Sequence, residues 1–126
     1  MDSSRLILPL VGLSGFLAVC AGAFGAHGVS DPAAKALLQT GGHYQLIHAL
    51  AALACWLVAR QGLAMAMLSA WLFLGGALIF SGTLYLLAFG APHVLGAVTP
   101  LGGLALLAGW ANLTVSPFFR RRKPSV

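Results

Sequence analysis

Four histidines are the side chains in this sequence that are best able to do chemistry: His27, His43, His48 and His93. An imidazole can ligate a metal, carry a proton, or hydrogen-bond inside a protein. His43 and His48 are five residues apart, which places them about 140° from one another around a helix. That spacing disfavours a metal or haem site. Two other interpretations stay open: an internal hydrogen-bond network, and a shallow pocket for a small molecule, a lipid headgroup or a proton.

His48 is the most informative of the four because it lies inside an apolar run. An ionisable residue in such a run predicts a site with partners on neighbouring helices. Leu46, Leu50, Leu53 and Leu57 fall on one side of this predicted helix, so His48 should face the other helices. The polar residues that we expect to cluster with it, together with His48 itself, are His27, Tyr44, Gln45, His48, Ser81, Tyr85 and Thr99.

No catalytic arrangement accompanies these residues. The sequence contains no serine elbow, phosphate-binding loop or paired carboxylates, and the two acidic residues, Asp2 and Asp31, lie outside the apolar runs. We therefore expect a protein that is not an enzyme, with no cofactor and no bound metal. Cys20 and Cys55 are interpreted as small buried residues rather than a redox pair.

The composition predicts an integral membrane protein. Of the 126 residues, 60% are hydrophobic and only 7% are charged, which leaves too little polar surface for a small soluble domain. The net charge of +5 does not indicate a nucleic-acid partner, because most of the basic residues form one cluster, Arg120 to Lys123. Such a cluster is typical of a cytoplasmic membrane anchor, and membrane lipids are the expected partners.

Four apolar stretches are long enough to cross the bilayer as helices, and they predict an all-α bundle in a single domain, residues 1–126. The expected spans are about 6–26, 43–59, 63–89 and 93–115, followed by a basic tail, 116–126. Between the first two spans we expect a short interfacial helix, Ala33 to Thr40, capped by Asp31 and ended by Gly41-Gly42. The fourth span begins either near His93 or at Pro100 with Thr99 as its cap.

Glycines repeat along one face of several spans. Small residues let helices approach closely in lipid, where the hydrophobic effect does not hold helices together. The glycines expected at such contacts are Gly22, Gly25, Gly28, Gly82, Gly102, Gly103 and Gly109. The same contacts suit a second copy of the chain or another membrane protein as a partner.

The distribution of basic residues predicts the orientation. If both termini are cytoplasmic, Arg5, Arg60 and the Arg120 to Lys123 cluster lie inside and only Lys35 lies outside. The histidines would then gather in the outer half of the bundle.

Four sequence motifs, in order, resemble the YgdD-like inner-membrane family. They are GAFGAHG at Gly22 to Gly28, YQLIHALAAL at Tyr44 to Leu53, FSGTLYLLAF at Phe80 to Phe89, and LGAVTPLGG followed by GW at Leu95 to Trp110. The resemblance covers nearly the whole chain and implies a four-span protein of the bacterial plasma membrane, with relatives in eukaryotes and no established activity. His43 departs from the family pattern, which makes a four-histidine metal site less credible.

These observations lead to one main functional expectation and two alternatives. The first is a non-enzymatic membrane component that acts by binding or assembly with lipid or another protein. The second is a small carrier, which would have to form oligomers because four thin helices enclose little volume. The third, a metal- or haem-binding protein, is disfavoured by the histidine spacing.

Overall fold

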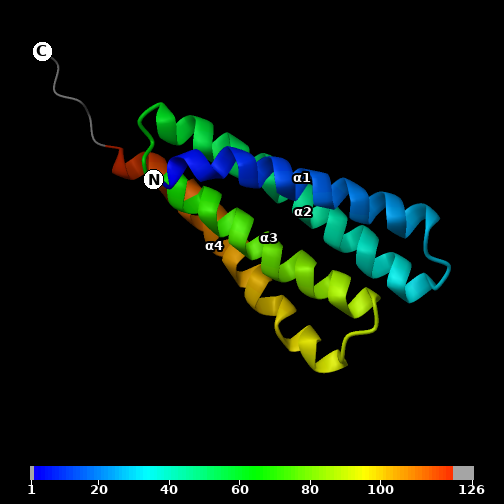
Figure 1. The fold of residues 1–126 in the computed structure, drawn as a ribbon. Coiled ribbons are helices and arrows are strands. Elements are labelled where there is room, and N and C mark those ends of the chain that lie inside the picture. Colours follow the sequence, from blue (N-terminus) through cyan, green and yellow to red (C-terminus); the bar gives the residue numbers. More distant parts are fainter. Residues whose placement is uncertain (1, 121–126) are drawn as a thin grey trace, which may run out of the picture.

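The computed structural model describes residues 2–120 and is built from four long helices (Figure 1). They are α1 (Ser4–His27), α2 (Pro32–Arg60), α3 (Ala66–Ala88) and α4 (Thr99–Val115). The short 3₁₀ helices η1 (His93–Ala97) and η2 (Ser116–Phe119) flank α4, so that His93–Phe119 forms the fourth stretch able to cross a membrane. Residues 2–120 contain no β-strand. The predicted four-helix, all-α membrane fold is confirmed. The basic tail lies mostly outside the described residues.

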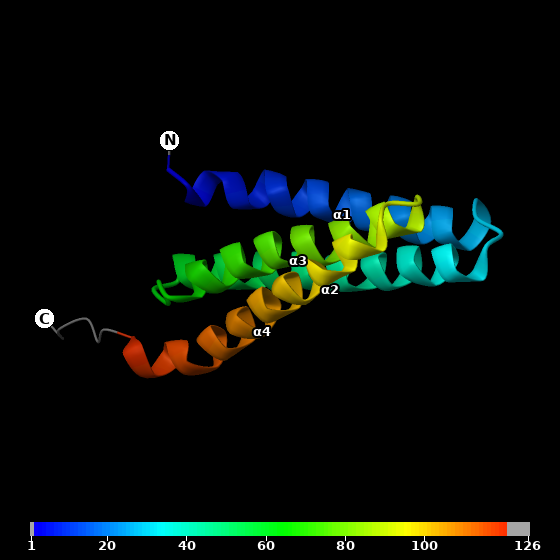
Figure 2. The same cartoon turned by 90° about the horizontal axis from the view of Figure 1, so that it is seen from below.

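Each helix runs antiparallel to the next and packs mainly against its neighbours in sequence (Figure 1). Helix α2 packs extensively against both α1 and α3, α4 packs against α3, and the direct contact of α1 with α3 is small. Figure 2 shows α4 crossing α3 at an angle, so that it diverges from the other helices. This arrangement leaves two spaces open along the sides of the bundle, one between α2 and α4 and one between α1 and α3.

The separate interfacial helix between the first two spans was a wrong prediction. Residues 33–40 are helical, but they form the first turns of a continuous α2. The predicted start is confirmed: the Asp31 carboxylate accepts a hydrogen bond from the Ala34 N–H at 2.9 Å, with Pro32 in the first turn. The predicted end at Gly41-Gly42 does not exist.

The two glycines permit close helix packing instead. A Cβ at Gly41 would lie 2.5 Å from the Tyr85 ring of α3, and one at Gly42 would lie 2.9 Å from the Ala18 carbonyl oxygen of α1. At this pair the missing side chains let α2 approach both neighbours closely, which is a typical use of small residues in membrane helices.

Each expected start of the fourth span matches part of the structure: the helical stretch able to cross the membrane begins at His93 with the 3₁₀ turn of η1, and its α-helix, α4, begins at Thr99 beside Pro100. Thr99 is not its cap. The residue at the cap position is Val98, and no side chain caps the helix. The Thr99 hydroxyl instead lies 2.7 Å from the Thr83 hydroxyl, so it joins α4 to α3.

Candidate functional site

His48 lies near the middle of α2, and its side chain is 6% exposed. Its ring is surrounded by three aromatic rings, at centroid distances of 6.0 Å from Tyr44, 5.5 Å from Phe73 and 5.9 Å from Trp110. The prediction that His48 faces inward is confirmed. Because α2 begins at Pro32 and not at His43, His48 lies near the middle of its helix instead of near its start.

Both ring nitrogens of His48 are hydrogen-bonded by the protein. Nδ1 lies 2.7 Å from the Tyr44 carbonyl oxygen, and the Trp110 indole N–H donates to Nε2 at 3.1 Å. A carbonyl only accepts and an indole only donates, so Nδ1 carries the proton and Nε2 is a bare acceptor. The arrangement therefore selects one neutral tautomer, and a protonated imidazolium would lose the bond from Trp110.

Helix α3 holds Trp110 in position although α2 and α4 do not pack extensively. Phe73 of α3 packs against both His48 and Trp110, with its ring centroid 4.7 Å from that of Trp110. Gly109 leaves room for that ring, since a Cβ there would lie 2.7 Å from it. The Ser69 hydroxyl donates to the Gly109 carbonyl at 2.8 Å, and the Asn112 amide donates to Ser69 at 2.8 Å. These contacts set the rotation of α4 that aims Trp110 at His48.

A cleft of about 540 Å³ lies between α2 and α4, with His48 and Trp110 in its wall. We call it the His48 cleft. Its other walls are mainly apolar and include Tyr44, Phe80 and Gly103. Leu104 and Leu107, which are 61% and 65% exposed, lie at its edge, so it is open to the lipid around the bundle.

The other predicted polar residues do not join His48 in one cluster. Tyr85 donates to the Gln45 side-chain oxygen at 2.6 Å, and Ser81 donates to the Gly41 carbonyl at 2.7 Å. These two bonds link α2 to α3, while Thr99 pairs with Thr83. His27, His43 and His93 are exposed. Of the predicted set, only Tyr44 contacts His48 directly, through ring stacking and its carbonyl.

Sequence reasoning missed Trp110, Phe73 and Asn112 as neighbours of the site. An indole N–H in an apolar run is itself a signal, because a donor in hydrocarbon needs an acceptor within the protein. The sequence does not say which helix supplies that acceptor.

The predicted packing glycines have different surroundings. A Cβ at Gly25 would lie 3.0 Å from Leu38 of α2, and one at Gly102 would lie 2.8 Å from the Gly76 carbonyl oxygen of α3.

Gly22 contributes backbone to the contact with Gly42, whereas a Cβ at Gly28 would meet Phe24 of its own helix. Gly82 faces open space, and the nearest atom to a Cβ at Gly103 is 3.8 Å away. Gly76 and the pair Gly41-Gly42 are close contacts that the prediction left out.

Within residues 2–120, no three His, Cys, Asp or Glu side chains lie together in a way that could hold a metal ion. Since both His48 nitrogens are engaged by the protein, this ring offers no free ligand atom in the observed arrangement.

The family model described as "Protein of unknown function (DUF423)" matches residues 21–103, well over half of the chain. The chain belongs to the DUF423 family. A relative from Haemophilus influenzae, "UPF0382 membrane protein", is 47% identical, and the match covers 88% of this chain and 92% of the relative. "UPF0382 inner membrane protein YgdD" of Escherichia coli is 38% identical over 96% of this chain and 95% of its own. "UPF0382 membrane protein YwdK" of Bacillus subtilis is 35% identical over 89% and 95%.

No solved structure matches this chain. The resemblance to the YgdD-like family is confirmed by these relatives, and so is the multi-pass membrane character that goes with it. The DUF423 match ends at Gly103, so Trp110, the hydrogen-bond donor to His48, lies beyond it.

Proposed function

We propose that this protein is a non-enzymatic binding component of the bacterial plasma membrane, and that it holds a lipid acyl chain in the His48 cleft. The observation that carries this proposal is an apolar cleft of about 540 Å³ with a buried histidine in its wall whose two nitrogens are already satisfied. A neutral imidazole whose two nitrogens are both hydrogen-bonded to the protein is poorly placed to transfer a proton or to ligate a metal. The His48 ring instead forms part of the cleft wall, and its hydrogen bond with Trp110 joins the two sides of the cleft.

The surroundings of the cleft favour a lipid chain over a water-soluble ligand. Its exposed edge is made of leucines, and Tyr44 and Trp110 supply aromatic surface inside it. A site of this kind accepts a flexible apolar chain through dispersion contacts, which is the main packing force available in a bilayer.

The proposal is tested with a variant that fills the cleft but does not disturb the packing of the helices. Gly103 lines the cleft and has no atom closer than 3.8 Å to an added Cβ, so Gly103→Leu should fold and occupy the lipid's place. We expect native mass spectrometry of protein released gently from its own membrane to show a phospholipid adduct on the wild type. Gly103→Leu should reduce the adduct at least fivefold.

Gly12→Leu is the matched control, because Gly12 lies on the exposed side of α1 with open space at its Cβ position. It should keep the adduct. Equal adducts on all three proteins would contradict binding in the cleft, and a bare wild-type monomer would contradict lipid binding altogether.

We further propose that both termini face the cytoplasm. In support, Arg5, Arg60 and Arg120 lie at one end of the bundle: the Trp56 indole donates to the Ser4 carbonyl at 2.9 Å, and Arg120 donates to the Gln61 carbonyl at 3.3 Å. Lys35 lies at the other end, in the first turns of α2. Basic residues concentrate on the cytoplasmic side of membrane proteins.

Reporter fusions check this orientation. A green fluorescent protein fused after Val126 should fluoresce in bacterial cells, whereas alkaline phosphatase fused at the same point should be inactive. The reverse pair of results would place the C-terminus outside and overturn the assignment.

A further inference from the structure

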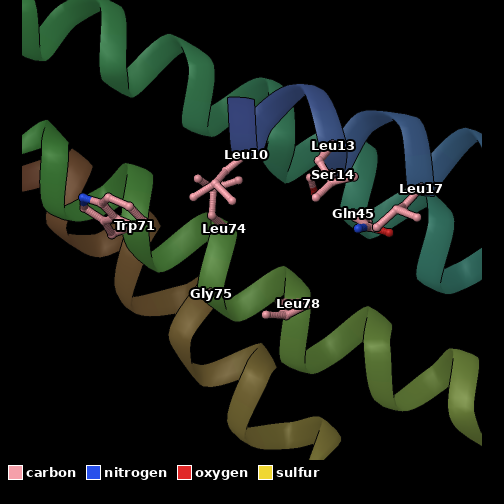
Figure 3. A pocket seen from close by; sticks show the side chains of 9 residues that line it. All are labelled: Leu10, Leu13, Ser14, Leu17, Gln45, Trp71, Leu74, Gly75 and Leu78. Atoms are coloured by element: carbon pink, nitrogen blue, oxygen red, sulfur yellow. The ribbon is translucent and has the colours of Figure 1, made fainter. Parts of the chain in front are cut away.

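A second hollow, which we call the Gln45 cavity, lies between α1 and α3 (Figure 3). It exists because α1 and α3 both pack on α2 and make little direct contact with one another. Its volume is about 220 Å³. Leu13, Leu17 and Leu78 are 55%, 44% and 68% exposed and form its rim, so the cavity is reached from the hydrocarbon around the bundle.

Gln45 of α2 lies at the floor of this cavity and is only 4% exposed. Its side-chain oxygen accepts the hydrogen bond from Tyr85, but no acceptor among residues 2–120 is hydrogen-bonded to its amide nitrogen. No fully enclosed side-chain nitrogen or oxygen in that part of the chain lacks a partner, so this amide must reach the cavity surface. Figure 3 shows the carboxamide between α1 and α3.

Ser14 of α1 adds a second donor to the same cavity. Its hydroxyl makes no hydrogen bond to residues 2–120, although a serine in a helix often bonds the carbonyl one turn earlier. An unpaired N–H or O–H in hydrocarbon is costly. Two such donors facing one apolar cavity therefore favour an occupant that brings an acceptor.

The depth of the cavity restricts what that occupant is. Ser14 and Gln45 lie near the middle of α1 and α2, so they sit near the bilayer midplane, about 15 Å from the lipid ester and headgroup region. A phospholipid carries its acceptors at the interface and does not present one at this depth. The backbone of a neighbouring helix would rest on the exposed rim leucines, so it would not itself supply an acceptor to the 4% exposed Gln45.

We infer that the Gln45 cavity binds a membrane-dissolved apolar molecule that carries a carbonyl oxygen, the chemistry of a quinone or a long-chain ketone. The amide of Gln45 and the hydroxyl of Ser14 donate to that oxygen, and the leucines enclose the apolar body. The site is separate from the His48 cleft and does not depend on the lipid binding proposed there.

Binding of a radiolabelled 1,4-benzoquinone with a ten-carbon tail, measured on the full chain in phospholipid nanodiscs, tests this inference. We expect saturable binding above empty nanodiscs, displaced by unlabelled quinone and not by decylbenzene, which has the tail and ring but no carbonyl. Ser14→Ala should weaken binding about fivefold, the effect expected from losing one neutral hydrogen bond.

A pair of glycine variants on α3 locates the site. Gly75 lines the cavity and Gly82 does not, and both have open space at the Cβ position. Gly75→Leu should therefore abolish binding and Gly82→Leu should leave it unchanged. The inference is overturned if the wild type binds no more than empty nanodiscs, if decylbenzene competes as well as the quinone, or if Gly75→Leu binds like the wild type. A Gly75→Leu protein that loses a dimer instead of quinone binding would assign the cavity to a second copy of the chain.

Discussion

Phe73→Ala is expected to lower the free energy of unfolding by about 3 kcal/mol, the low end of the range for a buried phenylalanine. The Phe73 side chain is 0% exposed and packs against the rings of both His48 and Trp110. Its removal leaves a cavity where α2, α3 and α4 meet, and a membrane protein gains stability largely from such dispersion contacts. The same change should loosen the bond from Trp110 to His48, because Phe73 packs against both rings and its loss lets them shift.

Reversible unfolding in mixed micelles, followed by circular dichroism, measures this loss. Phe118→Ala is the matched control, since Phe118 is 85% exposed and outside the core. That variant should change stability by less than about 0.5 kcal/mol. Equal effects of the two substitutions would show that Phe73 does not hold the core together as the structure indicates.

Gly102→Ala is expected to destabilise the protein by about 1 to 3 kcal/mol, through overpacking. The added methyl group would collide with the backbone N of Phe80 and lie 2.8 Å from both the Gly76 carbonyl oxygen and the Phe80 Cα. Backbone atoms in the middle of α3 cannot move aside as a flexible side chain can. The α3–α4 contact must therefore separate, which also displaces Trp110 from His48.

The adjacent Gly103 gives an internal control for this prediction. Gly103→Ala adds the same methyl group to the same turn of α4, where the nearest atom is 3.8 Å away. We expect it to be neutral or slightly stabilising, because alanine favours a helix over glycine. A thermal-unfolding comparison of the two variants decides the point. A Gly102→Ala protein as stable as Gly103→Ala would mean that α3 and α4 do not approach as closely as described.

Local chemistry determined the elements that sequence reasoning predicted well. Long apolar runs are enough to predict four membrane helices, since a bilayer requires its spans to satisfy their own backbone. Asp31 and Pro32 correctly predicted that a helix begins at this point, although not that it continues as α2, because capping depends on residues within one turn. The leucines at one side of α2 correctly placed His48 on the inner face.

Only the tertiary structure decided how these elements meet. Gly41-Gly42 has the local features of a helix end, but the helix continues through it. Ala18 and Gly22 of α1 and Tyr85 of α3 occupy the space that side chains at these two positions would need. His48 pairs with Trp110, and Thr99 with Thr83, rather than with one another. In helices that are apolar on nearly every side, the sequence pattern constrains rotation about the helix axis only weakly. That rotation is set by which backbones can approach, and it decides which polar groups find partners and which, like the amide of Gln45, face an open cavity.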